Sequence, residues 1–115
     1  MRLKSAIWVS AYLRQCQKEG AFVAIRRRGD EDAGAIFIKI SYLDARADLF
    51  GPAPQTSFDE AQPQDRAFIR TFAETPADDA KVEERLAQET GFDPDLWIIE
   101  VEDRQGRNFL DKIVS

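Results

Sequence analysis

Three arginines, a glycine and three acidic residues follow one another at positions 26–32, with the sequence RRRGDED. Carboxylate oxygens are the ligands that Mg²⁺ takes in metal-dependent hydrolases. Nuclease cores often add an acidic residue and a lysine on the next strand, but the residues at that spacing here are Phe37 and Lys39. Because the acidic member is missing, we interpret 26–32 as a solvated turn with local ion pairs and predict no metal ligand. A metal-dependent hydrolase centred on Gly29-Asp30-Glu31-Asp32 is the second alternative.

Aromatic and basic residues alternate in several apolar segments of the chain. On one sheet face they would stack the bases of single-stranded nucleic acid and hold its phosphates. A homo-oligomeric interface explains the same phenylalanines more simply, because exposed apolar patches commonly mark protein contacts. We therefore predict a protein interaction surface and keep single-stranded nucleic-acid binding as the first alternative. The predicted surface comprises Phe22, Arg26, Arg27, Arg28, Asp30, Phe37, Lys39, Arg66, Phe68 and Arg70.

Nucleophilic catalysis has little support in the sequence. Cys16 is the only cysteine, and the chain has no histidine. A Cys16 nucleophile would lack the usual general base, and zinc sites built on Cys and His cannot be assembled. Cys16 also lies on the apolar stripe of a predicted helix, which is typical of a core residue. We predict no catalytic residue, no cofactor and a protein that is not an enzyme.

Length and composition favour one soluble domain spanning 1–115, with 43% apolar and 32% charged residues. The first residues are basic and then apolar, but Arg14 and Lys18 end that run too soon for a signal peptide or a membrane span. We expect a cytoplasmic protein without a membrane partner. The net charge of −5 disfavours a nucleic-acid partner, since a basic field supplies most non-specific affinity for nucleic acid.

The elements that would position these residues follow from apolar periodicity. The 3.6-residue period predicts helices over 6–19, ended by Gly20, and over 76–90. The two-residue period predicts strands at 21–27, 36–40, 47–50, 65–72, 96–102 and 107–110.

The first two of these strands read as a hairpin around the charged turn, and the polar stretch 55–64 reads as a surface loop tied down by Phe58. Most strand-to-strand links are too short for parallel crossovers. We therefore predict an α+β fold with a mainly antiparallel sheet of about five strands and two helices packed on one face.

Several short motifs are distributed along the chain: Arg2-Leu3 leading to Trp8-Val9 and Leu13-Arg14, the Arg27-Arg28-Gly29-Asp30 turn with Ala33-Gly34, Gly51-Pro52-Ala53, and Phe92-Asp93-Pro94-Asp95-Leu96-Trp97 before Glu100-Val101-Glu102-Asp103. Together these motifs resemble a small bacterial family known as domain of unknown function 1491. The resemblance covers nearly the whole chain. It implies a stand-alone, single-domain bacterial protein, and it brings no catalytic residue, substrate or cofactor.

We interpret the sequence as a cytoplasmic protein-interaction or accessory module that is not an enzyme and that self-associates across a sheet face. The observation behind this is the surplus of phenylalanines on the predicted strands, compared with the cover that two helices on one face supply. An unknown protein partner fits the same surface.

Overall fold

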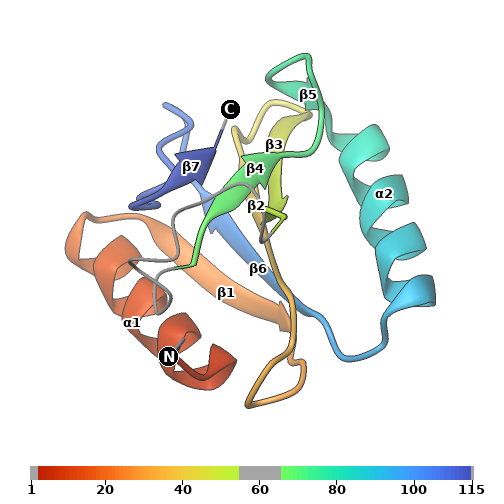
Figure 1. Ribbon diagram of the computed structural model, residues 1–115. Coiled ribbons are helices and arrows are strands. Elements are labelled where there is room, and N and C mark those ends of the chain that lie inside the picture. The colour runs from red at the N-terminus through yellow and green to blue at the C-terminus, as the bar shows by residue number, and fades with distance from the viewer. Residues whose placement is uncertain (1–2, 55–65, 115) are drawn as a thin grey trace.

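The computed structural model describes residues 3–54 and 66–114, in which two helices pack against one sheet (Figure 1). The α+β class is confirmed, but the sheet is mixed and has seven strands rather than about five. The elements in chain order are α1 Ser5–Lys18, β1 Phe22–Arg27, β2 Ile36–Ser41, β3 Arg46–Pro52, β4 Phe68–Arg70, β5 Ala77–Asp78, α2 Asp79–Phe92, β6 Trp97–Glu102 and β7 Ile113–Val114. The predicted loop 55–64 and its Phe58 lie outside the described residues.

The predicted hairpin of the first two strands is wrong, because β6 lies between them. The strand order is β1-β6-β2-β3-β4-β7, with β5 beside β3. The β6 strand is antiparallel to β1 and parallel to β2. A central place suits β6, since side chains on both of its faces, including Trp97, Ile98 and Ile99, are buried.

The turn between β1 and β2 is built around the segment that enters β6. The indole Nε1 of Trp97 donates a hydrogen bond to the Asp30 carbonyl at 2.8 Å, and the amide of Asp30 donates to the Asp95 carbonyl at 2.9 Å. A Cβ added at Gly29 would lie 2.2 Å from the Asp95 carbonyl oxygen, so only glycine allows this close approach. The turn residues therefore hold the inserted strand in place.

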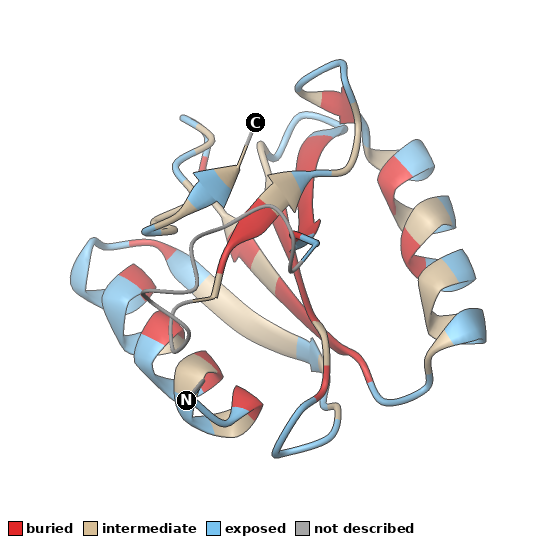
Figure 2. Cartoon of the chain, viewed as in Figure 1, coloured by how far each residue is buried: buried red, intermediate tan, exposed pale blue. Residues whose placement is uncertain are grey.

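The two helices pack on opposite faces of the sheet, so the predicted one-sided arrangement is wrong (Figure 1). On one face α1 buries Val9, Tyr12 and Cys16 against β1, β2, β3, β4 and β6. On the other face α2 buries Val82 and Leu86 against β2, β3 and β6. Figure 2 shows buried residues along the central strands and on the sides of both helices that face them. Apolar side chains on both faces of β2 and β6 demand this two-sided cover.

The ends of some elements differ from their predicted positions. Helix α2 begins at Asp79 rather than at residue 76, and the hydroxyl of Thr75 is hydrogen-bonded to the Asp48 carboxylate instead of capping the helix. The predicted strand 107–110 does not form; Tyr12 donates its hydroxyl hydrogen bond to the Asn108 carbonyl at 2.7 Å. The chain pairs with the sheet only afterwards, through β7 beside β4.

Within the described ranges, each helix has 14 residues, and neither is long and apolar enough to cross a lipid bilayer.

Candidate functional site

The aromatic residues predicted to share one surface do not share it. Phe37 is buried under α2, and Phe68 is buried on the opposite face, where the Trp8 ring of α1 lies 5.2 Å from its ring. Only Phe22, at the start of β1, is exposed, at 62%. The prediction of one open aromatic face is therefore wrong, because each helix covers the phenylalanine on its own side.

Two of the predicted basic residues, Arg26 and Lys39, meet in a network that we call the α2 charge cluster. Its acidic members are Asp79, Glu83 and Glu100. The Lys39 ammonium lies 2.6 Å from Asp79 Oδ1 and 2.5 Å from Glu83 Oε2. The Arg26 guanidinium donates two hydrogen bonds to Glu83, at 2.7 and 2.8 Å, and one to Glu100 at 3.0 Å.

The pKa values of the α2 charge cluster show that its members are charged and paired with one another. Hydrogen bonds from Arg26 and Lys39 overcome partial desolvation and lower the pKa of Glu83 from 4.5 to about 2. Burial alone would lower the pKa of Lys39, but its carboxylate partners outweigh burial and raise it. Two cations facing three carboxylates leave no excess positive charge for phosphate. The cluster therefore joins α2 to the sheet and is a poor nucleic-acid site.

The arginine-rich turn is likewise tied to its own chain. Arg27 donates a hydrogen bond to the Pro94 carbonyl at 2.7 Å, and the Arg28 guanidinium lies 5.1 Å from the centre of the Trp97 ring. The carboxylate of Asp30 accepts the amide hydrogen bond of Ala33 at 2.9 Å. Among the residues that the structure describes, no three His, Cys, Asp or Glu side chains are placed to hold a metal ion. The geometry of this turn gives the hydrolase alternative no support.

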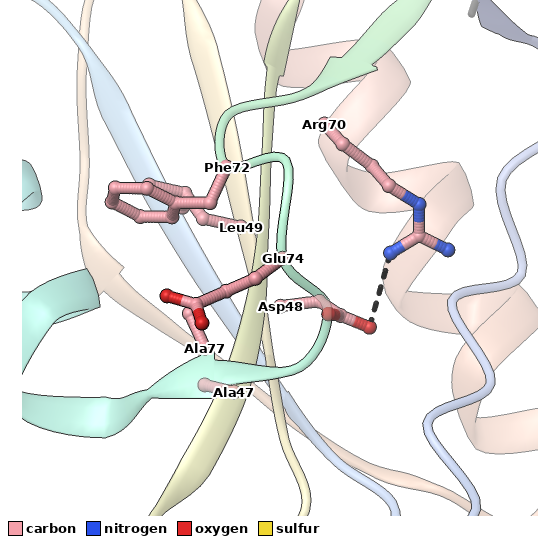
Figure 3. Close-up of a pocket in the computed structure, with 7 residues that line it drawn as sticks. All are labelled: Ala47, Asp48, Leu49, Arg70, Phe72, Glu74 and Ala77. Atoms are coloured by element: carbon pink, nitrogen blue, oxygen red, sulfur yellow. Dashed lines mark ion pairs between the residues drawn. The ribbon is translucent and has the colours of Figure 1, made fainter.

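Arg70 belongs to a network around Asp48, a buried carboxylate that the sequence analysis missed. Arg70 lies 3.2 Å from Asp48 Oδ2 (Figure 3). Tyr42 donates its hydroxyl hydrogen bond to the same oxygen at 2.7 Å. Burial and the hydrogen bond to Asp48 raise the pKa of Tyr42 to about 12. The hollow beside Arg70 and Asp48 is too small to hold a water molecule, so this network is structural.

A hollow of about 490 Å³ lies between α1, β4 and the segment 107–112; we call it the aromatic groove. The rings of Trp8 and Tyr12 stack on one wall, with centroids 5.0 Å apart and planes at 16°. The groove is lined by Leu3, Trp8, Ala11, Tyr12, Gln15, Arg66, Phe68, Phe109, Asp111 and Lys112. Of the ten predicted surface residues, only Arg66 and Phe68 belong to it.

The C-terminal wall of the aromatic groove is held by local hydrogen bonds. Asp103 accepts hydrogen bonds from the Arg107 amide at 2.6 Å and from its Nε at 3.1 Å, and the Arg107 guanidinium lies 5.1 Å from the centre of the Phe109 ring. Phe109 itself has a φ of 57°, which is unusual for a residue with a side chain. On the opposite wall, Arg66 donates to the Leu3 carbonyl at 2.8 Å. These contacts order the segment that carries Phe109 and tie Arg66 to the residue that precedes α1 by two positions.

Tyr12 and Cys16, which lie at and behind the aromatic groove, are not activated nucleophiles. Burial raises the pKa of the Tyr12 phenol and of the Cys16 thiol behind it, so both groups are neutral at pH 7. Neutral groups of this kind are poor nucleophiles. What the groove offers is apolar ring surface with a few polar groups at its rim.

Comparisons with known proteins identify the family. A family model described as "Protein of unknown function (DUF1491)" matches residues 3–111. The chain belongs to the DUF1491 family. The resemblance seen in the sequence motifs is thereby confirmed.

Solved structures of similar proteins agree with this assignment. The chain is similar to a DUF1491 family protein from Caulobacter crescentus CB15, whose crystal structure has 30% sequence identity and a TM-score of 0.80, with 100% of each chain covered. A protein from A. tumefaciens, solved in solution, has 35% identity and a TM-score of 0.81, with 100% of this chain and 98% of that chain covered. A search of curated proteins gave no match.

The aromatic groove of this DUF1491 chain was missed at the sequence level for a physical reason. Its rings come from α1, β4 and the segment 107–112, and only the tertiary fold brings these together. One local signal existed. Trp8 and Tyr12 are four residues apart and therefore lie on the same side of a helix.

Proposed function

We propose that this DUF1491 chain is a cytoplasmic accessory protein, not an enzyme, whose aromatic groove accepts an aromatic side chain of a partner protein. The observation that carries the proposal is the groove itself. Its volume of about 490 Å³ lies within the range of small-molecule sites, and rings from three segments line it. A single free, buried cysteine fits a reducing compartment.

The arrangement of the rings supports an aromatic guest. Trp8 and Tyr12 stack, whereas the Trp8 and Phe68 planes are tilted by 42°. Tyr12 and Phe68 are buried, whereas Trp8 and Phe109 are partly exposed, so a further ring would pack against the open sides of Trp8 and Phe109. Tryptophan and tyrosine side chains also dominate the binding energy of protein interfaces, because they bury much apolar area and keep one polar atom.

The nucleic-acid alternative has less support. Arg26, Arg27, Arg28 and Arg70 all make contacts within the protein, and the chain as a whole carries a net charge of −5. A surface for phosphate needs cationic groups in excess of nearby carboxylates. Neither the α2 charge cluster nor the Asp48 network offers that excess.

A titration with N-acetyl-tryptophan amide tests the proposal, with N-acetyl-alanine amide as the matched control ligand. We expect NMR shift changes at the indole of Trp8, which lines the groove, and none at the buried indole of Trp97. Ala11→Trp should fill the groove and weaken binding by about tenfold or more, because Ala11 lines it. Ser10→Trp adds the same side chain at the neighbouring exposed position of α1, outside the groove, and should bind normally.

Three results would count against a partner in the groove. The first is equal shifts with both amides, and the second is unchanged binding in Ala11→Trp. The third concerns Phe58: if Phe58→Ser strengthens binding of N-acetyl-tryptophan amide, the natural occupant is a side chain of this same protein and the proposed function is wrong.

A further inference from the structure

Strand β1 is an open edge of the sheet. It is the first strand in the order β1-β6-β2-β3-β4-β7 and, within residues 3–54 and 66–114, it pairs only with β6. Apart from that pairing, no backbone hydrogen bond joins residues 22–27 to any other described segment. An edge strand of six residues therefore presents unpaired N–H and C=O groups at alternate positions, which is a template for another strand.

The first four side chains of β1 give this edge little protection, whereas its last two residues are arginines. Natural edge strands are blocked by charges, prolines or bulges. Residues 22–25 are uncharged and contain no proline, and Phe22 is 62% exposed. The register shift comes only after Ile25, where Arg26 bulges out of the ladder, and Arg26 is already bound to Glu83 and Glu100. The exposed part of the edge is thus apolar and regular.

The two ends of β1 carry opposite charges. Glu19 lies three residues before the strand, and Glu102 is paired with Phe22 at its start. Arg27 ends the strand, and Arg28 follows it. Two copies of β1 laid antiparallel would bring the basic end of each beside the acidic end of the other. A parallel arrangement would place like charges together, so charge complementarity selects the antiparallel one.

We propose that the partner of β1 is a second copy of this chain, whose own β1 pairs antiparallel to it about a two-fold axis at Ala24. The axis stands perpendicular to the sheet, so residues on one face of the sheet meet residues of the same face in the other copy. Val23 of each copy then lies opposite Ile25 of the other, so an uncharged pair stands on each side of the axis within the regular part of the strand. Arg28 approaches Glu19 across the interface. The two sheets become one continuous sheet.

This inference is independent of the aromatic groove, since the groove is lined from α1, β4 and residues 107–112 and no residue of β1 lines it. It also revises the predicted mode of self-association. The contact is made along a strand edge, and Phe37 and Phe68 stay buried in each copy.

Sedimentation equilibrium of the full chain over a wide concentration range tests the proposal. We expect a monomer–dimer equilibrium for the wild type. Ala24→Lys places two like charges opposite each other at the two-fold axis and should raise the dimer Kd by about tenfold or more, while circular dichroism shows an unchanged fold. Phe92→Ser is the matched control, because Phe92 is 87% exposed on α2 and should leave the dimer intact.

A second measurement keeps the proposal open to failure if Ala24→Lys misfolds. Ala24→Cys should form an intermolecular disulfide quickly under mild oxidation, because Ala24 faces its own copy, whereas Gln88→Cys on the exposed side of α2 should not. The native Cys16 is fully buried and does not interfere. A wild type that stays monomeric, or equal cross-linking at both positions, would overturn the proposal.

Discussion

The two helices cover the sheet in different ways. On its face α2 makes a dense apolar contact, bordered by the α2 charge cluster, in which Lys39 is almost fully enclosed. On the other face α1 buries Val9 and Cys16 completely, but the large rings of Trp8 and Phe109 leave the aromatic groove open beside them. The comparison teaches that one face of the sheet is closed by its helix, whereas the other keeps an open apolar groove, which is where we propose that a partner binds.

The sharpest test of this contrast is a substitution in the core under α2, where we expect the largest loss of stability. Phe37→Ala should lower the free energy of unfolding by about 4 kcal/mol, since the ring is buried and lies so close to Gly51 that a Cβ there would be 2.9 Å from it. Urea denaturation followed by circular dichroism measures the change. The same truncation at Phe92, which is 87% exposed, should cost less than about 0.5 kcal/mol.

The next largest loss in the free energy of unfolding should come from the α2 charge cluster. Lys39→Met removes the enclosed cation and leaves carboxylates facing one another, so we expect a loss of about 3 kcal/mol in the free energy of unfolding. Lys81→Met removes an exposed lysine 3.0 Å from Glu74 and should change stability by less than about 0.5 kcal/mol. Similar losses in the two variants, seen in urea titrations, would mean that the cluster does not fasten α2.

Truncation in the aromatic groove should cost less. Trp8→Ala removes a half-buried ring with one side open, and we expect a loss of about 1.5 kcal/mol together with loss of N-acetyl-tryptophan amide binding. Ile7→Ala, at an exposed position of α1 outside the groove, is the control. If Trp8→Ala were as destabilising as Phe37→Ala, the two faces would not differ as we describe.

The smallest effect should be the pH dependence that comes from Glu83. The pKa of Glu83 is lowered in the folded state, to about 2 from 4.5, so its contribution is fully present above pH 4.5 and is lost as the pH falls toward 2. Solvent screening reduces its size, because the side chain is 36% exposed. Urea midpoints of the wild type and Glu83→Gln should therefore differ at pH 7 and converge near pH 2. If the difference between the two urea midpoints did not change with pH, the contacts with Arg26 and Lys39 would not be lowering the pKa of Glu83.

Much of the local structure was predictable, because it depends on neighbouring residues. The apolar stripe of Val9, Tyr12 and Cys16 identified α1, and Gly20, with a φ of 84°, ends the region as expected. The runs that became β2 and β6 were predicted within one or two residues. In these segments the two-residue and 3.6-residue periods are uninterrupted, so local pattern and final structure agree.

The arrangement of these elements was not predictable from the same patterns. Sequence neighbours usually pair, but β6 follows β3, β4, β5 and α2 in the chain and still lies between β1 and β2. Phe37 and Ile38 are both apolar but point to opposite faces of the sheet. The sequence pattern therefore does not show which face each helix covers. Of the candidate site, only Trp8 with Tyr12 carried a local signal, since Phe68 and Phe109 reach the groove through tertiary packing.

The insertion of β6 has a consequence for biosynthesis. A ribosome releases the chain from its N-terminus, so β1 and β2 emerge long before residues 97–102. Before then β1 and β2 lack β6, the strand that separates them in the folded sheet. If β1 and β2 paired with each other as a hairpin, β6 could not insert between them. The β1-β6-β2 part of the sheet can therefore form only after residues 97–102 have been made, and contacts of such long sequence separation slow folding.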